Sequence, residues 1–283
     1  MKNKYSYPFK LLSLILFTSI TCLFSCSSNR YIYSASTPNN PYFTKKGQSK
    51  LTGYYSSSSE DLLTNKYADG WDLQGAYAID KHWALTAAYF NRREKDVYNQ
   101  DDYNGPFDSS VITYRRNLFE FGGGYFIPLN AKKTITFNFF GGMAFGKFSF
   151  NDNGLDGNMA NYSRYHTSHI SKWFFQPSIN FMPGRYVRIS FTLKSSYVHY
   201  GNIRTSYSAT ELQYFSLDNL ANRTLNFIEP AWDFQFGLPK FPWVKLDMAV
   251  SGVSSPPIHQ LDVRANNTSI GLSFDFSKMG KSK

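Results

Sequence analysis

The sequence contains little charge and almost no cysteine. Charged residues make up 18% of its 283 residues, and its only two cysteines are Cys22 and Cys26. Two cysteines this close to the amino terminus exclude a disulfide framework or a cysteine metal site in the remaining chain. So low a share of charge is unusual for a surface covered by water. We therefore expect part of the surface to contact something other than water.

The chain also lacks a long hydrophobic run and a concentrated basic segment. Its main apolar stretch, residues 9–20, is too short for a transmembrane helix. The formal charge is +10, and subtracting Lys2, Lys4 and Lys10, which precede the expected cleavage point, leaves +7. Because the remaining basic residues are scattered and form no recognisable motif, nucleic acid is not an expected partner.

The amino terminus has the order of an export signal, with basic residues first and an apolar stretch after them. It ends in Leu23-Phe24-Ser25-Cys26, which resembles the lipobox of bacterial lipoproteins. We expect a signal peptide in residues 1–25, a lipid on Cys26 and a polar, lipid-anchored tether in residues 26–47. Cleavage by an ordinary signal peptidase and a retained signal-anchor helix remain open alternatives.

Alternating apolar and polar residues recur from residue 48 to residue 277. The clearest case is 187–194, in which Val187, Ile189, Phe191 and Leu193 alternate with polar or charged residues. Such alternation is typical of a strand with two different faces. Comparable patterns occur in 71–79, 119–127, 135–145, 172–181, 244–251 and 269–276, and no segment shows a sustained helical period.

The connections between these strands alternate in length. Short turns are expected at 80–81, 130–132, 183–184 and 239–240, and long polar links at 56–69, 92–110, 151–167, 201–223 and 253–265. Outer-membrane barrels combine short periplasmic turns with longer external loops. The sequence thus predicts an all-β fold, a closed antiparallel up-and-down transmembrane β-barrel. We expect about 10 strands, within a range of 8 to 12, both termini in the periplasm, and a basic tail at residues 278–283.

Several charged residues fall on the polar side of the predicted strands and should face the lumen. They are Asp72, Glu120, Lys172, Arg188, Lys194, Glu229, Asp233, Lys245, Asp247 and Asp275. Inside a narrow barrel such groups must pair or stay hydrated. Two interpretations remain open, a filled interior of paired charges and a selective conduit. No catalytic residue, metal ligand or cofactor is assigned.

The predicted external rim contains residues that could support catalysis. They are the histidines His166, His169 and His199, with Asp152, Asp156 and Ser168 as possible neighbours. A histidine paired with a carboxylate can activate water or a hydroxyl group, as in a hydrolase or an acyltransferase. No nucleophile-elbow motif accompanies them. Residues 151–158 loosely suit Ca²⁺ but lack the complete EF-hand pattern, which favours a simple turn.

Two further patterns concern the wall and its ends. Glycines at 122–124 and 141–142 are expected to permit bending or close strand approach. Basic residues gather at the predicted periplasmic end, where they could meet anionic lipid headgroups or a periplasmic partner, or simply fix the depth of the barrel. These residues are Lys81, Lys132, Lys133, Arg185, Lys240, Lys278, Lys281 and Lys283.

The chain resembles the porin-like outer-membrane β-barrel lipoproteins of Bacteroidota. The likeness lies in Tyr31-Ile32-Tyr33-Ser34, Asn40-Pro41-Tyr42-Phe43, Lys46-Gly47, the segment 72–77 and the closing segment 270–276. The resemblance implies a fold and a location but no activity and no catalytic residues. The terminal Phe276 also resembles the aromatic end of the signal that the barrel-assembly machinery reads, so that machinery and outer-membrane lipid are the expected partners.

These observations predict a non-enzymatic barrel with a structural, adhesive or narrow transport role. One alternative is a barrel enzyme acting at the outer surface, with a site built on the rim histidines. A second is a periplasmic, lipid-anchored β-sandwich that binds a ligand. In a sandwich the apolar row that includes Phe191 would pack against another layer of the same protein instead of facing outward.

Overall fold

A computed structural model describes residues 30–58, 67–98, 107–184, 186–238, 240–254 and 261–278. The predicted signal peptide, Cys22, Cys26, Arg185, Lys281 and Lys283 lie outside the described residues. No helix among the described residues is long and apolar enough to cross a membrane.

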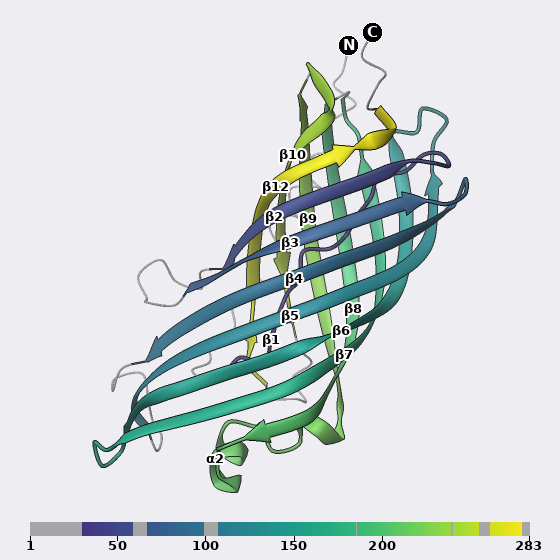
Figure 1. The fold of residues 1–283 in the computed structure, drawn as a ribbon. Helices are drawn as coiled ribbons and strands as arrows, with labels where there is room; N and C mark the ends of the chain where they lie inside the picture. Colours follow the sequence, from purple (N-terminus) through teal and green to yellow (C-terminus); the bar gives the residue numbers. More distant parts are fainter. Residues whose placement is uncertain are drawn as a thin grey trace, which may run out of the picture.

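Ten antiparallel strands close into a single barrel, as Figure 1 shows. Sequential strands are neighbours, and the last strand pairs with the first, Asp275 facing Lys50, to complete the wall. The strands are β2 (Ser49–Ser58), β3 (Tyr67–Ala78), β4 (Trp83–Tyr98), β5 (Phe107–Pro128), β6 (Ile135–Asp156), β7 (Asn161–Phe181), β8 (Val187–Thr205), β9 (Thr224–Leu238), β10 (Phe241–Gly252) and β12 (Asn266–Asp275). The predicted fold class and strand number are confirmed, and the β-sandwich alternative is wrong.

The two ends of the barrel differ in their connections. At one end, which we call the turn end, the strands are joined by the predicted short turns, in residues 79–82, 129–134, 182–186 and 239–240. At the opposite end, the loop end, the β8–β9 connection contains α2 (Ala209–Tyr214) and η2 (Leu220–Asn222). The chain leaves the barrel through η4 (Phe276–Lys278), which follows β12 at the turn end.

An apolar band surrounds the outside of the barrel next to the turn end. Along β8, Val187, Ile189, Phe191 and Leu193 point away from the lumen, as the alternation predicts, because the residues between them are buried. Equivalent exposed positions on the other strands are Leu73, Leu85, Phe121, Phe139, Trp173, Phe236, Met248 and Leu272. An apolar outer face on a closed barrel suits the hydrocarbon of a membrane.

The polarity of the two faces reverses toward the loop end. On β6, the outward residues change from Phe145 to the exposed Lys147 and Asn151, while the inward residues become Phe148 and Phe150, each 1% exposed. At about 3.3 Å per residue and a tilt of about 45°, the 22 residues of β6 rise about 50 Å. Since the apolar band of such barrels is only about 25 Å tall, the wall continues well beyond the membrane.

The observed strands correct the bounds of four predicted links. Residues 56–58 and 67–69 belong to β2 and β3, and residues 201–205 belong to β8. Residues 92–98 belong to β4, and residues 151–156 belong to β6, so that the β6–β7 connection comprises only residues 157–160. The physical reason is that strands outside the membrane need no apolar outer face. Their sequence therefore resembles a polar loop although their backbone remains paired.

Residues 30–43 run through the interior of the barrel. Within them, β1 (Tyr33–Ser34) pairs in parallel with β11 (Val263–Arg264), a short strand from the connection between β10 and β12. The expectation that this stretch is only a polar tether is corrected by its burial. A ten-strand barrel has room for an extended chain, because the lumen widens with strand number and eight strands are already filled by side chains.

Candidate functional site

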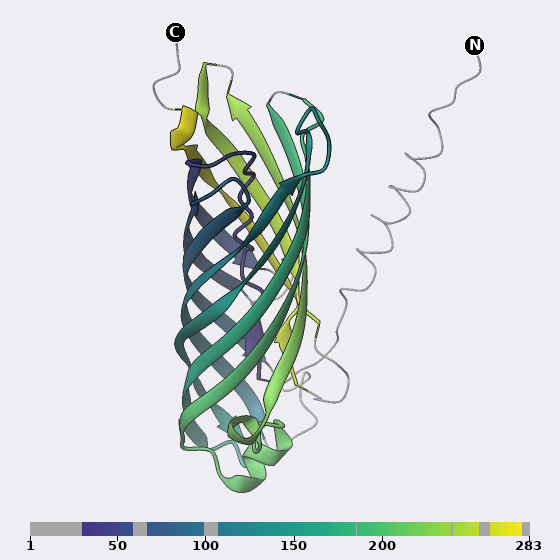
Figure 2. The ribbon, with the colours of Figure 1, turned by 90° about the vertical axis from the view of Figure 1, so that its right-hand side faces the viewer.

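The lumen is occupied by the segment from Arg30 to Phe43, which we call the plug. Every one of its residues is buried, and Figure 2 shows it passing inside the wall of strands. The plug contains a single charged residue, Arg30, and is otherwise composed of aromatic, small and amide side chains. The plug and the side chains around it form the candidate site, because they decide whether anything can pass through the barrel.

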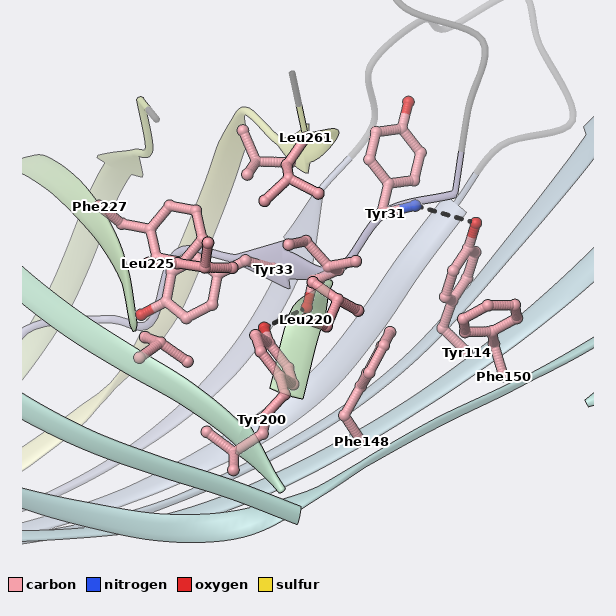
Figure 3. Packing of buried hydrophobic residues seen from close by; sticks show 14 of the residues in the cluster. Tyr31, Tyr33, Tyr114, Phe148, Phe150, Tyr200, Leu220, Leu225, Phe227 and Leu261 are labelled. Carbon is pink, nitrogen blue, oxygen red and sulfur yellow. Dashed lines mark hydrogen bonds between the residues drawn. The ribbon is translucent and has the colours of Figure 1, made fainter. Parts of the chain in front are cut away.

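The first part of the plug lies in an apolar cluster near the loop end, shown in Figure 3. The ring of Tyr33 stacks on Phe227, with ring centroids 4.2 Å apart and planes 3° from parallel. The carbonyl of Ile32 accepts a hydrogen bond of 2.8 Å from the hydroxyl of Tyr200. Leu220 of η2 closes over the same cluster, so the β8–β9 connection covers the plug from the loop end.

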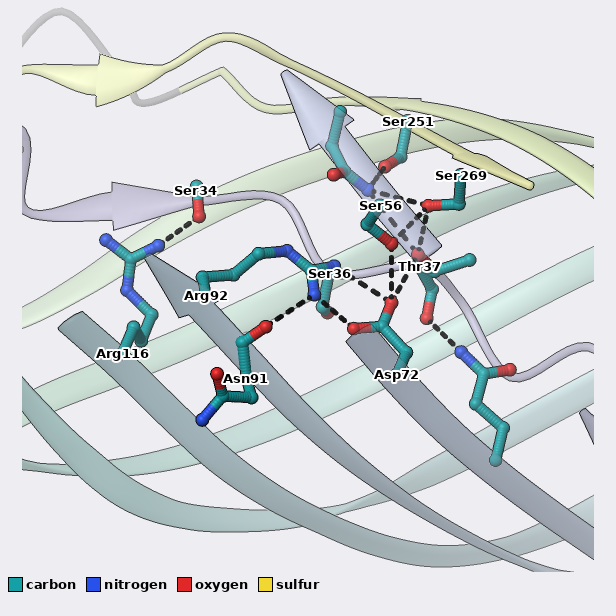
Figure 4. Close-up of polar contacts among 12 residues, drawn as sticks. Ser34, Ser36, Thr37, Ser56, Asp72, Asn91, Arg92, Arg116, Ser251 and Ser269 are labelled. Atoms are coloured by element: carbon teal, nitrogen blue, oxygen red, sulfur yellow. Dashed lines mark hydrogen bonds and ion pairs between the residues drawn. The ribbon is translucent and has the colours of Figure 1, made fainter. Parts of the chain in front are cut away.

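Wall side chains form hydrogen bonds with the centre of the plug, as Figure 4 shows for Thr37. Its hydroxyl donates to Asp72 at 2.7 Å and lies 2.7 Å from the hydroxyl of Ser269. The carbonyl of Thr37 accepts from Gln74 at 2.7 Å. Because an unsatisfied buried polar group costs about 1–3 kcal/mol, these partners stabilise the segment at this position.

The last part of the plug contacts the wall near the turn end. The amide of Asn40 donates to Asn180 at 2.9 Å, and its side-chain carbonyl accepts from Asn138 at 3.0 Å. The hydroxyl of Tyr42 donates to the carbonyl of Lys133, in the turn between β5 and β6. The plug is thus held by the wall from one end of the lumen to the other.

All ten charged residues predicted to face the lumen are buried in the interior. Their exposed fractions do not exceed 8%: Asp72, Glu120, Lys172, Arg188, Lys194, Glu229, Asp233, Lys245, Asp247 and Asp275. Ion pairs join Asp247 to Lys50 at 3.2 Å and Lys245 to Asp275 at 3.8 Å. Near the turn end, the guanidinium of Arg188 lies 4.5 Å from the ring centre of Tyr42.

Four of these charges converge on the plug at the centre of the barrel. Glu120 accepts from Lys172 at 2.5 Å and from Lys194 at 2.8 Å, while Glu229 accepts from the hydroxyl of Tyr33 at 2.9 Å. Lys172 in turn donates to the same Tyr33 oxygen at 3.1 Å. Two acids and two bases therefore form a neutral network that includes a plug side chain.

Glycines in the wall make room for this network. Gly122 and Gly142 are paired across β5 and β6, and a Cβ on Gly142 would lie only 2.9 Å from the ring of Phe174. That ring packs beside the ammonium group of Lys194, 4.6 Å from its centre. The glycines thus allow a bulky aromatic side chain to lie against the wall, in keeping with the close approach that their pattern predicts.

Sequence reasoning missed another set of interior charges near the loop end. Arg264 on β11 pairs with Glu94 at 2.9 Å and with Asp96 at 2.7 Å, and Arg116 lies 3.3 Å from Glu94. The available signal was the alternation of residues 84–96, whose even-numbered positions are all buried. This alternation is hard to recognise because the polar composition of residues 92–110 resembles that of a loop.

Two voids between plug and wall are small. One void of about 20 Å³ lies beside Tyr33 and Arg116, and another of about 10 Å³ lies beside Asn39 and Glu120. A water molecule needs about 10–15 Å³, so these voids have space for a single water or little more. Of the two interpretations that the sequence left open, the buried plug and the paired charges favour the filled interior.

The rim histidines do not come together. His166 is buried and stacks on Phe150, with ring centroids 5.1 Å apart, and neither of its ring nitrogens has a hydrogen-bond partner among the described residues. His169 and His199 lie on the outer face, where they and Lys147 line a groove of about 490 Å³. The histidine–carboxylate pair on which the enzyme alternative depends is not formed by these residues.

The two rim aspartates have structural partners. Asp152 faces inward and pairs with Arg30 of the plug, with Nε 3.0 Å from its carboxylate. Asp156 accepts from the backbone amides of Asn158 and Ala160, each at 2.9 Å, and so closes the β6–β7 turn. Within the described residues, no group of three or more histidine, cysteine or acidic side chains could hold a metal ion.

The closed wall, the apolar band and the charged interior together define an outer-membrane β-barrel with an occupied lumen. No protein-family profile matches the chain, and no curated protein matches its sequence. Among solved structures, the translocator domain of the autotransporter NalP from Neisseria meningitidis is 8% identical to this chain, with a TM-score of 0.46. That match covers 94% of this chain and 95% of the NalP domain. The outer-membrane protease OmpT from Escherichia coli is 10% identical, with a TM-score of 0.41 and coverage of 82% and 94%.

A third neighbour is Ail, the attachment invasion locus protein of Yersinia pestis. It is 12% identical, with a TM-score of 0.32, and the match covers 82% of this chain and 99% of that one. At these identities the likeness to each neighbour is one of fold alone.

Proposed function

We propose that this protein is a non-enzymatic outer-membrane barrel with a structural or adhesive role, and that its resting lumen does not conduct solutes. The observation that carries the proposal is the plug, whose residues 30–43 are all buried between the strands. Of the roles predicted from the sequence, narrow transport would require the plug to leave its position. The surface available to other molecules is then the extended wall and α2 at the loop end.

The proposal includes export by the signal in residues 1–25, acylation of Cys26 and placement of the turn end in the periplasm. The lipobox-like Leu23-Phe24-Ser25-Cys26 supports the acylation. Short periplasmic turns and longer external connections in outer-membrane barrels support the orientation. The Bacteroidota-type lipoprotein assignment rests on the sequence resemblance alone.

The expected partners are outer-membrane lipid, the barrel-assembly machinery and a periplasmic molecule at the turn end. The turn-end lysines include Lys81, Lys132, Lys133 and Lys240, which lie in or beside the short turns. In the proposed orientation they could attract the anionic headgroups of lipid or an acidic surface of a periplasmic protein.

Conductance in planar lipid bilayers tests the closed lumen. We expect the full-length protein to produce no discrete current steps, whereas deletion of residues 30–43 should produce stable open channels. Because the deletion removes many contacts, the milder variant Tyr33→Ala/Thr37→Ala/Asn40→Ala should be measured beside it, and it should flicker between closed and open levels.

A heat-modifiability gel on each preparation shows that its barrel is folded. Phe139→Ala is a matched control, because it removes a large side chain from the outer wall and should leave the lumen closed. Steady conductance of the wild-type protein, equal to that of the folded plug variants, would contradict the proposal.

A further inference from the structure

The plug has a defined direction within the barrel. At the loop end, Arg30 pairs with Asp152, and its guanidinium lies 4.0 Å from the ring centre of Phe215, directly after α2. At the turn end, Tyr42 donates to the carbonyl of Lys133. From Arg30 onward the chain therefore enters at the loop end and leaves at the turn end, where β2 begins.

Contacts along one strand show the same direction independently. Strand β6 runs from the turn end to the loop end, and its Asn138 contacts Asn40 whereas its Asp152 contacts Arg30. Higher numbers on the strand thus correspond to lower numbers on the plug. Fully extended, the 14 residues of the plug reach at most about 50 Å, comparable to the rise of the longest strands.

The two ends of the described chain consequently lie on opposite sides of the barrel. Arg30 is buried at the loop end against Phe215, directly after α2, whereas η4, ending at Lys278, follows β12 at the turn end. Residue Asp275 of β12 pairs with Lys50 of β2, just after the plug leaves the lumen. This separation differs from the expectation that both termini share the periplasmic side.

We propose that the barrel presents its own amino terminus at the loop end. Arg30 lies against Phe215, directly after α2, and Cys26 is four positions earlier in the sequence, a chain length of at most about 14 Å. An acyl group on Cys26 would then be delivered to the external side, not the periplasmic side. This inference concerns the direction of the plug, whereas the closed lumen requires only its presence.

Epitope tags in intact cells test the direction. One tag is inserted between Ser28 and Asn29, a second between Gly157 and Asn158 at the loop end, and a third after Pro183 at the turn end. We expect antibody to bind the first two tags to within about twofold in intact cells. The third should bind at least tenfold better after the outer membrane is permeabilised.

The comparison between tags makes the result independent of the orientation of the barrel. If the loop-end tag is hidden and the turn-end tag is exposed, the barrel is inverted, and the amino-terminal tag should still follow the loop-end tag. An amino-terminal tag that behaves like the turn-end tag would overturn the proposal.

A disulfide test shows whether the plug is threaded in the membrane-inserted protein. The hydroxyls of Thr37 and Ser269 lie 2.7 Å apart, so Thr37→Cys with Ser269→Cys should cross-link on mild oxidation and change the mobility of the protein on a gel. Thr37→Cys with Ser273→Cys is the control and should stay reduced, because Ser273 is also buried on β12 but lies four residues nearer the turn end. Equal cross-linking of both pairs, or of neither, would contradict a fixed, threaded plug.

Discussion

At the scale of single residues, many of the charges in the interior are arranged in ion pairs. Glu120 lies between the ammonium groups of Lys172 and Lys194, and both lysines are only 1% exposed. Removing one member of a buried pair leaves an uncompensated charge, which costs more than the pair itself contributes. Glu120 is therefore the residue on which the central network depends most.

We predict that Glu120→Gln destabilises the folded barrel by about 3–5 kcal/mol, the usual cost of breaking a buried ion pair. The measurement is the urea dependence of the folded fraction on a heat-modifiability gel. Asp218→Asn is the matched control, an acid-to-amide change at an exposed position of the β8–β9 connection, and should change stability by less than about 0.5 kcal/mol.

A double variant tests whether the stability lost in Glu120→Gln comes from an unpaired charge or from altered packing. Glu120→Gln combined with Lys194→Met removes the cation that has lost its partner, and it should recover part of the lost stability. A single variant as stable as the wild type would show that the lysines are neutralised elsewhere.

The alternation of residues predicted which charges face inward but not their partners. The ion pair between Arg30 and Asp152 joins residues 122 positions apart, and the hydrogen bond from Tyr33 to Glu229 joins residues 196 positions apart. A period of two residues assigns a side chain to one face of a strand. It does not say which other segment that face meets, so the network could not be predicted from the sequence.

At the scale of whole strands, the reversal of polarity along β5 to β8 marks where the membrane ends. The sequence predicted the part of each strand that lies in the apolar band, since alternation is strong there. It did not predict the part beyond the band, because strands that face water on the outside carry the same residue types as loops. The apolar inner residues of that part, such as Phe148 and Phe150, are the signal that remains.

We predict that an arginine is costly within the band and harmless beyond it. Phe139→Arg should destabilise the barrel by about 2–4 kcal/mol, because Phe139 is exposed in the middle of the band. Asn151→Arg, on the outward face of the same strand, should change stability by less than about 0.5 kcal/mol. Urea unfolding in lipid vesicles measures the change in stability of both variants. Equal destabilisation by the two arginines would contradict the position assigned to the apolar band.

Helix α2 is stabilised at its start by a capping box. The hydroxyl of Ser208 accepts from the backbone amide of Glu211 at 3.2 Å, and the carboxylate of Glu211 accepts from the backbone amide of Ser208 at 2.6 Å. Burial alone would raise the pKa of Glu211, but these hydrogen bonds and the guanidinium of Arg164 outweigh it and lower the pKa. The box thus favours the ionised carboxylate.

The lowered pKa gives the helix a defined pH dependence. The contribution of Glu211 to stability is fully present above the pKa of an unfolded glutamate, and it is lost as the pH falls through the lower pKa of the folded state. We predict that amide exchange at Leu212 accelerates as the pH falls through that range, relative to intrinsic exchange. Glu211→Gln should remove most of this dependence, and a wild-type profile with no change in relative exchange would contradict it.

At the scale of the whole molecule, the plug is the feature that sequence reasoning could not identify. Residues 30–43 contain Pro38 and Pro41, polar amides and no sustained alternation, which is also the composition of a flexible linker. The partners that satisfy the backbone of the plug come from strands far apart in the sequence, among them Gln74 of β3, Asn138 of β6 and Glu229 of β9. They surround the plug only when the barrel is closed, so no local pattern distinguishes a plug from a tether.

The position of the plug beside the closing seam bears on the order of assembly. The plug continues directly into β2, and β2 pairs with β12, the last strand to be synthesised. While that seam is open, the amino-terminal residues can enter the lumen sideways between two unpaired edges. Once β2 and β12 are paired, the plug can enter or leave the lumen only along the barrel axis, past the packed side chains. We therefore expect the plug to occupy the lumen before β12 pairs with β2 during insertion into the membrane.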